Sequence, residues 1–94
     1  MQSDEYEWDD EKAAANLKKH GVSFEEATTV FKDVNVKLRL DEEHSTEDEE
    51  RWHAIGSTNK ARLVVTVIVD REGRVRVISA RKATAAGQRF YATH

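Results

Sequence analysis

The pattern of hydrophobic and polar positions divides the chain into a helical first third and a β-rich remainder. Alternation over residues 5–8 predicts a short strand. Residues 12–20 are rich in alanine and lack β-branched side chains, so we expect a helix there that ends at Gly21. Ser23 and Glu26 have the spacing of a capping box, which predicts a second, short helix after that turn.

Period-two alternation and turn residues predict four further strands and a closing helix. Their expected ranges are residues 34–40, 51–57, 62–69 and 74–80 for the strands and residues 82–91 for the helix. The acidic stretch 41–50 is interpreted as a solvated loop. The order β-α-α-β-β-β-β-α predicts an α+β fold, in which a small antiparallel sheet packs against the N-terminal helices. No repeat or linker is evident, so residues 1–94 are expected to form a single domain.

Sorting the strand positions by parity predicts that one face of the sheet is almost purely basic. The side chains expected to point toward the helices are Val34, Val36, Leu38, Leu40, Trp52, Ala54, Leu63, Val65, Val67, Val69, Val75 and Val77. Those expected on the opposite face are Lys37, Arg39, Arg51, His53, Arg62, Arg74 and Arg76, with Val64, Thr66 and Ile68 between them. Solvated faces usually mix both signs of charge, so this pattern favours contact with phosphate over a plain solvated face or a dock for an acidic protein segment.

The distribution of charge supports a charged partner. The 94-residue chain has a net charge of −3. Residues 1–50 hold six Lys and Arg against sixteen Asp and Glu, a balance of −10, whereas residues 51–94 hold nine against two, a balance of +7. Such asymmetry suggests a nucleic acid or an oppositely charged protein as partner, or two halves that neutralise each other within the fold.

Composition excludes several other classes of protein. The chain has no cysteine, which excludes disulfides, thiolate zinc sites and cysteine nucleophiles. The histidines lack metal-ligand spacing and no glycine-rich phosphate loop is present, so we expect neither a metal nor a cofactor. No apolar run is long enough to span a membrane, and the acidic N-terminus is unlike a signal peptide, so a cytoplasmic location is expected.

A basic sheet face that carries a histidine has the groups needed to cleave RNA without a metal. The 2′-hydroxyl attacks the adjacent phosphate when a base takes its proton and cations stabilise the developing charge. Histidine suits proton transfer near neutral pH, and His53 lies among several arginines, so it is a candidate acid or base or else an ordinary surface residue. Trp52 is either a stacking platform for a base or, as its inward parity favours, a core residue.

Motifs along almost the whole chain resemble the BrnT family of toxins. They are Trp8-Asp9, Lys12, Asn16, the run Lys-His-Gly-Val-Ser-Phe-Glu-Glu-Ala at 19–27, Val30-Phe31, His44-Ser45, Glu-Glu-Arg-Trp at 49–52, Ile55-Gly56, Leu-Val-Val at 63–65, Arg-Val-Ile-Ser-Ala-Arg at 76–81, Ala83 and Tyr91. The resemblance implies a RelE-like fold and the toxin of a type II toxin–antitoxin system. Such a toxin is an endoribonuclease that cleaves RNA, free or on the ribosome, and so inhibits translation. The implied partner is a BrnA-type ribbon-helix-helix antitoxin, in a heterotetramer of two toxins and two antitoxins that contacts operator DNA only through the antitoxin.

The resemblance also assigns functional residues by position. Activity is implied for Glu50, Arg51, Trp52, Arg62, Arg76 and Arg81, beside the candidate His53. RNA contacts are expected from Lys37, Arg39, Trp52, Arg74 and Lys82. The closing helix departs from the family pattern: residues 85–91 contain fewer arginines, and Gly87 costs about 1 kcal/mol of helix stability. The alternative is therefore a catalytically weak or inactive homologue that acts as a non-enzymatic, antitoxin-binding corepressor.

Overall fold

Strands and helices follow one another in the predicted order. The computed structural model describes residues 5–94, and its elements are β1 (Tyr6–Glu7), α1 (Asp10–His20), α2 (Phe24–Thr28), the 3₁₀ helix η1 (Thr29–Lys32), β2 (Lys37–Leu40), β3 (Arg51–Ser57), β4 (Leu63–Arg71), β5 (Arg74–Lys82) and α3 (Ala85–Thr93). The strands form one sheet in the order β1-β5-β4-β3-β2. Neighbouring strands are antiparallel except β1, which runs parallel to β5. The α+β class is thereby confirmed, while residues 1–4 of the expected domain lie outside the described residues.

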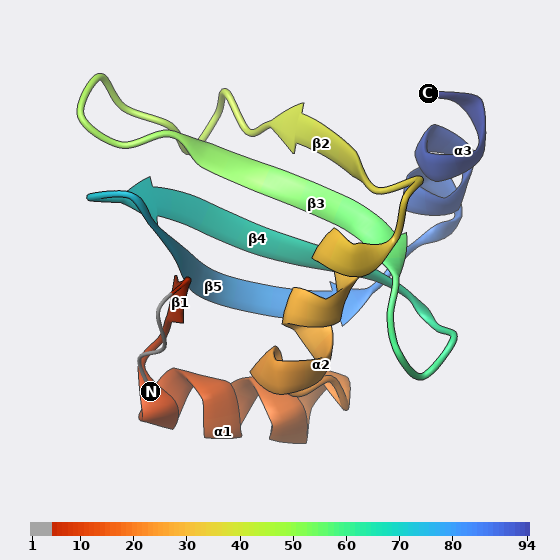
Figure 1. Cartoon of the computed structure of the whole chain (residues 1–94), viewed down its shortest axis with the longest axis horizontal. Helices are drawn as coiled ribbons and strands as arrows, with labels where there is room; N and C mark the ends of the chain where they lie inside the picture. The colour runs from red at the N-terminus through yellow and green to blue at the C-terminus, as the bar shows by residue number, and fades with distance from the viewer. Residues whose placement is uncertain (1–4) are drawn as a thin grey trace.

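Local hydrogen bonds and backbone geometry account for the ends of the two N-terminal helices, of which α1 begins two residues before the predicted range 12–20. Asp9 caps α1, because its Oδ1 accepts a hydrogen bond from the backbone N–H of Glu11 at 2.8 Å. Gly21 ends α1 at φ +70°, in the left-handed region that favours glycine. Ser23 caps α2, because its hydroxyl accepts a hydrogen bond from the N–H of Glu26 at 3.0 Å. Figure 1 shows that the turn at Gly21 brings both helices to the same side of the sheet.

The core lies between these helices and one face of the sheet. Its buried members are Trp8, Val22, Phe24, Ala27, Val30, Ala54, Val64, Ile68, Val77 and Ala80. Thr66 lies on this face too, and its buried hydroxyl donates to the carbonyl of Ala27 at 3.0 Å. The parity predicted for β4 is therefore wrong by one residue: Val64, Thr66 and Ile68 face the helices, and Leu63, Val65, Val67 and Val69 face the opposite side. β4 is the central strand and is buried on both faces. Its sequence is therefore almost uniformly apolar and does not indicate which alternate residues face the helices.

The strand expected at residues 34–40 is shorter than predicted. Val34 is 94% exposed and precedes β2, because Asp33 holds a turn by accepting a hydrogen bond from the N–H of Asn35 at 2.9 Å. Leu38 lies in β2 as expected, but it remains 55% exposed because this strand forms the edge of the sheet. The alternation therefore predicted the strand correctly but placed its start three residues too early.

The side chain of Asn16 joins α1 to the edge of β5. Its amide nitrogen donates to the carbonyl of Ala80 at 2.8 Å and to that of Val22 at 3.0 Å. Its amide oxygen accepts a hydrogen bond from the N–H of Ala80 at 3.1 Å. Because β1 pairs only with Val75 and Arg76 of β5, Asn16 supplies at Ala80 the hydrogen bonds that a neighbouring strand would make.

The closing helix α3 packs at the end of the sheet where β2 begins (Figure 1). It starts at Ala85 rather than at the predicted residue 82, because β5 continues to Lys82. Gly87 is buried there, and a Cβ on it would lie 3.7 Å from Cγ2 of Val65, so the helix approaches the sheet closely. Among residues 5–94, no helix has both the length and the apolar character that crossing a membrane requires.

Candidate nucleic-acid interface

Basic side chains gather on the sheet face that is turned away from α1 and α2. Residues paired across an antiparallel sheet point to the same side, so the strand register shows which side chains are neighbours. Arg39 of β2 pairs with His53 of β3, while Arg51 of β3 and Arg76 of β5 both pair with Val69 between them. We call this surface the basic face and define it by Lys37, Arg39, Arg51, His53, Arg74, Arg76 and Arg81. The side predicted for Lys37, Arg39, Arg51, His53, Arg74 and Arg76 is confirmed.

One end of the basic face is covered by α3. Lys37 donates from Nζ to the carbonyl of His94 at 2.7 Å. The guanidinium carbon of Arg39 lies 5.2 Å from the ring centroid of Phe90, which is a cation–π distance. Val65, in the same row as Lys37, lies against Gly87 of α3. The part of the basic face that α3 leaves open is therefore the region of His53, Arg51 and Arg76, with Arg39 at its border beside Phe90.

Arg51 and Arg76 flank the buried Val69 in this open region. Neighbouring strands lie about 4.8 Å apart, so the two arginines are roughly 10 Å apart at the backbone, with Val69 between them. The Nε of Arg51 is buried and makes no hydrogen bond with any of the described residues. Arg76 donates from Nη1 to Oε2 of Glu7 at 2.8 Å. Two guanidinium groups at this spacing suit a phosphate, which each can bind through paired N–H donors.

His53 is joined to a carboxylate at the end of β2. Its Nε2 lies 3.0 Å from Oδ2 of Asp41, and its Nδ1 lies 3.5 Å from a terminal nitrogen of Arg39. Burial acts to raise the pKa of Asp41, but the hydrogen bonds with His53 and His44 outweigh it and hold that pKa below its usual value. Asp41 is therefore an anion at neutral pH, and 16% of the His53 side chain remains exposed to a ligand on the open region.

Arg62, which was predicted on the basic face, lies on the helix side instead. Its Nε donates to Oε2 of Glu26 at 3.0 Å, and one terminal nitrogen donates to Oε1 of Glu26 and to the carbonyl of Gly21 at 3.0 Å. Glu26 is only 3% exposed, and its carboxylate, which a complete capping box would turn back to Ser23, also accepts a hydrogen bond from Thr58 at 2.7 Å. The guanidinium holds the pKa of Glu26 below its usual value, against the effect of burial. The predicted position of Arg62 is wrong for the same reason as the parity of β4, because Arg62 has the parity of Val64, Thr66 and Ile68 and these residues face the helices.

Three other predicted site residues also lie off the basic face. Trp52 pairs with Leu40 and Ile68 on the helix-facing side and packs against the core, which confirms the core interpretation of this residue and contradicts its place on the RNA-facing surface. Lys82 pairs with the core residue Val64, so it points to the helix side at the end of β5. Glu50 is exposed in the loop just before β3. The functional roles expected for these residues stay predictions.

The structure adds residues to this surface that the sequence pattern did not indicate. Glu7 reaches Arg76 because β1 pairs in parallel with β5, a long-range pairing that no local motif shows. Asp41 reaches His53 because β2 and β3 pair across a ten-residue loop. The alternation of polar and apolar residues does not predict the register of this pairing. Arg71 pairs with Arg74 and so shares its side, where it meets Glu49 at 3.4 Å. Asp41 could have been placed beside His53 from the sequence if the register between residues 37–40 and residues 51–57 had been predicted.

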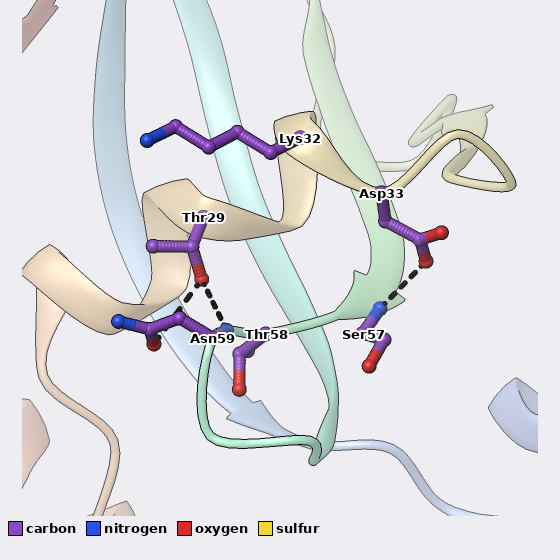
Figure 2. A pocket seen from close by; sticks show the side chains of 6 residues that line it. All are labelled: Thr29, Lys32, Asp33, Ser57, Thr58 and Asn59. Atoms are coloured by element: carbon purple, nitrogen blue, oxygen red, sulfur yellow. Dashed lines mark hydrogen bonds between the residues drawn. The ribbon is translucent and has the colours of Figure 1, made fainter.

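Hollows also lie elsewhere among the described residues. Figure 2 shows one of them, a cavity of about 290 Å³ between η1 and the connection from β3 to β4, lined by Thr29, Lys32, Asp33, Ser57, Thr58 and Asn59. Its polar groups already bind one another: Thr29 accepts from the N–H of Asn59 at 2.9 Å, and Asp33 accepts from the N–H of Ser57 at 2.8 Å. Another, about 260 Å³, runs between α1 and β5. Neither hollow contains a residue of the basic face.

Among residues 5–94, one group has the donor types of a metal site. Asp41, Glu43 and His44 each bring one possible ligand atom within 4.8 Å of the others. The imidazole of His44 is hydrogen-bonded to Asp41 at 3.0 Å, and Asp41 also binds His53. Exposed acidic groups often gather in this way without an ion, so the arrangement supports no metal assignment.

Comparison with known proteins identifies the class to which this fold and basic face belong. A family model that describes ribonuclease toxins of type II toxin–antitoxin systems matches residues 8–86. The match covers most of the chain, so the chain belongs to this family, which is the BrnT family. Membership in a type II system implies an antitoxin partner.

A solved structure supports the fold independently. The crystal structure of the Brucella abortus ribonuclease toxin BrnT, determined at 1.1 Å, superposes with a TM-score of 0.64. It shares 24% sequence identity, and the alignment covers 85% of this chain and 96% of that one. At this identity the likeness establishes the fold alone. No curated protein sequence matches the chain.

Proposed function

We propose that this chain is an endoribonuclease toxin that cleaves RNA by internal transesterification, without a metal ion, and thereby inhibits translation. The observation that carries the proposal is the open region of the basic face, where His53 lies beside Arg39 and where Arg51 and Arg76 flank Val69. Family membership supports ribonuclease activity, and the geometry supports this choice of residues.

The proposed reaction needs one proton acceptor and a site for negative charge. The 2′-oxygen of a ribose forms a bond to the adjacent phosphorus while the bond from phosphorus to the 5′-oxygen breaks. His53 accepts the 2′-hydroxyl proton, and the guanidinium groups of Arg51 and Arg76 stabilise the charge on the phosphoryl oxygens. The departing 5′-oxygen takes a proton from solvent, which leaves a 2′,3′-cyclic phosphate and a 5′-hydroxyl. The nucleophile belongs to the RNA itself, so the step needs no metal-activated water.

The remaining cations of the basic face extend the site along the RNA backbone. Arg74 lies on β5 two positions before Arg76, so it suits a phosphate that neighbours the scissile one. Arg81 pairs with Val65 at the end of the face next to α3, so it suits a phosphate farther along the RNA strand. Such contacts position the strand without reading its sequence. We assign Arg62 and Trp52 no part in the reaction; the ion pair of Arg62 with Glu26 and the packing of Trp52 against the core support a structural role for both.

We infer that the partner is a BrnA-type ribbon-helix-helix antitoxin, in an assembly of two toxins and two antitoxins that contacts operator DNA through the antitoxin. An acidic antitoxin segment on the basic face would neutralise the toxin by occupying the phosphate sites. The same face would meet RNA on the ribosome or free RNA. Light scattering of the co-expressed pair measures the stoichiometry, and cleavage assays with and without ribosomes separate the two kinds of target.

The experiment that tests this function uses purified protein, an end-labelled RNA and the same RNA with one 2′-deoxyribose at the mapped cleavage position, all in excess EDTA. We expect cleavage of the first RNA with a 2′,3′-cyclic phosphate end, and no cleavage at the substituted position. His53→Ala, Arg51→Ala and Arg76→Ala should each lower the rate by about 100-fold or more, the scale of one general base or one charge-stabilising group.

Matched variants on the helix side control for charge and for folding. His20→Ala and Lys18→Ala remove the same kinds of groups from the end of α1 and should leave the rate unchanged. Cleavage that requires added metal, or that survives His53→Ala at full rate, contradicts the mechanism. A well-folded chain that binds its antitoxin but leaves every RNA intact, with or without ribosomes, favours the non-enzymatic corepressor instead.

A further inference from the structure

Asp41 lies between two imidazoles at the junction of β2 and the acidic loop. Its Oδ2 is 3.0 Å from Nε2 of His53 and 3.0 Å from Nδ1 of His44. The two histidines differ in exposure: the His44 side chain is 57% exposed, whereas that of His53 is 16% exposed and the Asp41 side chain 11%. The contact with His53 is therefore the enclosed one and lies at the margin of the basic face.

The backbone around Asp41 is held in place against β3. The N–H of Asp41 donates to the carbonyl of Arg51 at 2.8 Å. The hydroxyl of Ser45 donates to the carbonyl of Asp41 at 2.6 Å and accepts a hydrogen bond from the N–H of Arg51 at 2.9 Å. These bonds close the loop onto the first residue of β3, two positions before His53, so the carboxylate is fixed relative to the imidazole before any ligand arrives.

We propose that Asp41 is a positioning residue for His53: it accepts a hydrogen bond from Nε2–H, leaves Nδ1 unprotonated toward Arg39 and the open region, and stabilises the imidazolium that forms when Nδ1 takes the 2′-hydroxyl proton. The catalytic role of Asp41 in this inference rests on the proposed function. The tautomer of His53 rests on the geometry alone. A neutral imidazole has one N–H donor and one acceptor, and an ionised carboxylate only accepts, so contact with Asp41 determines which nitrogen carries the proton.

Other charged groups lie close enough to matter for the pair. Arg39 of β2 faces Nδ1 at 3.5 Å, and its cation opposes protonation of that nitrogen. His44 contacts both oxygens of the same carboxylate, and Arg51 lies two positions away on the strand of His53. Asp41 is the anion in direct contact with His53, so its carboxylate offsets these cations where the imidazolium forms.

The tautomer is tested first, in the intact RNA-free protein, by ¹⁵N NMR of the histidine side chains. Near pH 8 we expect the His53 resonances of the tautomer with a proton on Nε2 and a free Nδ1. Asp41→Asn should abolish this preference, because an amide can donate as well as accept. A proton found on Nδ1 of His53 in the wild type overturns the inference, whatever the enzyme does.

The kinetic test compares Asp41→Asn with Asp48→Asn, which removes one carboxylate from an exposed position of the same loop. Asp41→Asn should lower kcat by roughly 10-fold to 100-fold with KM little changed, because it weakens the general base without removing it. The acidic limb of its rate–pH profile should move to lower pH, because the imidazolium loses its anionic partner. Asp48→Asn should match the wild type in both respects.

The two proposals fail in different ways. A wild-type chain that cleaves no RNA contradicts the proposed function, while the NMR result still decides the tautomer. A wild type that cleaves RNA beside an Asp41→Asn variant with unchanged kcat and pH profile overturns the role of Asp41 alone. A purely structural role predicts a lower urea midpoint with an unmoved pH profile, which also counts against the inference.

Discussion

Replacing Arg62 by alanine is expected to destabilise the fold strongly while leaving the open region of the basic face in place. The guanidinium donates to both carboxylate oxygens of Glu26 and to the carbonyl of Gly21. Thr58 donates to the same carboxylate at 2.7 Å. These contacts join α2, the end of α1 and the hairpin between β3 and β4, so their loss acts on the packing of the helices against the sheet.

The magnitude follows from the burial of Glu26. Its side chain is 2% exposed, so removal of Arg62 leaves a carboxylate in the interior with the Thr58 hydroxyl as its remaining side-chain donor. Breaking a buried ion pair in this way costs about 3–5 kcal/mol. The Arg62 side chain is 30% exposed, so water reaches the pair and we expect a value near the low end, about 3 kcal/mol. In a domain of this size that loss lowers Tm by roughly 12–24 °C.

Urea unfolding followed by tryptophan fluorescence measures this loss. Arg71→Ala is the matched control, because its ion pair with Glu49 has side chains 50% and 42% exposed and should contribute less than about 0.5 kcal/mol. Adding Glu26→Gln to Arg62→Ala should recover part of the stability, because no unpaired charge then remains buried. A urea midpoint of Arg62→Ala within error of the wild type refutes the reasoning. An Arg62→Ala variant that is as stable as the wild type but inactive would show that Arg62 takes part in RNA cleavage.

The pH dependence of the free energy of unfolding tests the same prediction independently. The folded-state pKa of Glu26 lies below its ordinary value because of the hydrogen bond from Arg62. The pair therefore contributes fully above the unfolded pKa of about 4.3, and that contribution is lost as the pH falls through the folded value. Without Arg62, burial is the dominant influence on Glu26 and favours its neutral form. The difference in stability between the wild type and Arg62→Ala should therefore shrink from pH 7 toward pH 4.

Three further substitutions test the packing, each by urea unfolding. Asn16→Ala should cost about 2–4 kcal/mol, because it leaves a buried N–H and a buried carbonyl of Ala80 without their partner. Gly56→Ala should cost about 1–3 kcal/mol, because a Cβ there would lie 3.1 Å from the backbone of η1; a neutral result would mean that η1 yields easily. Tyr91→Phe should cost about 1.5 kcal/mol by removing the hydrogen bond of 2.6 Å to Asp33, and an unchanged midpoint would show that water replaces it.

Local signals predicted the helices well, because the interactions that start and stop a helix involve residues close in sequence. Gly21 ends the first helix and Ser23 caps the second, as the sequence pattern indicates. The phase of β4 could not be predicted in this way, since β4 is buried on both faces and the polar residue within its apolar stretch, Thr66, is itself buried against the helices. A one-residue error in phase moves Val64 and Val65 to opposite faces, and it accompanied the wrong placement of Arg62.

The basic face was predictable to the extent that β2, β3 and β5 alternate cleanly. Arg39, Arg51 and Arg76 each have an apolar neighbour that marks the inward side, so parity places them correctly. Asp41 was not predictable, because the loop that follows it leaves the register of the hairpin open. The contact of Asp41 with His53 depends on that register alone.

The division of charge along the sequence serves two different ends in the fold. Three ion pairs among residues 5–94 join an acidic residue of the first half to an arginine of the second: Glu7–Arg76, Glu26–Arg62 and Glu49–Arg71. The carboxylate of Glu26 lies in the interior between elements, where no ligand can replace it without unfolding. Glu7 lies at the edge strand on the open face, where a phosphate offers the same paired acceptors to Arg76 and can take its place. Internal neutralisation and phosphate binding are therefore both supported, and the burial of the carboxylate decides which of the two each arginine serves.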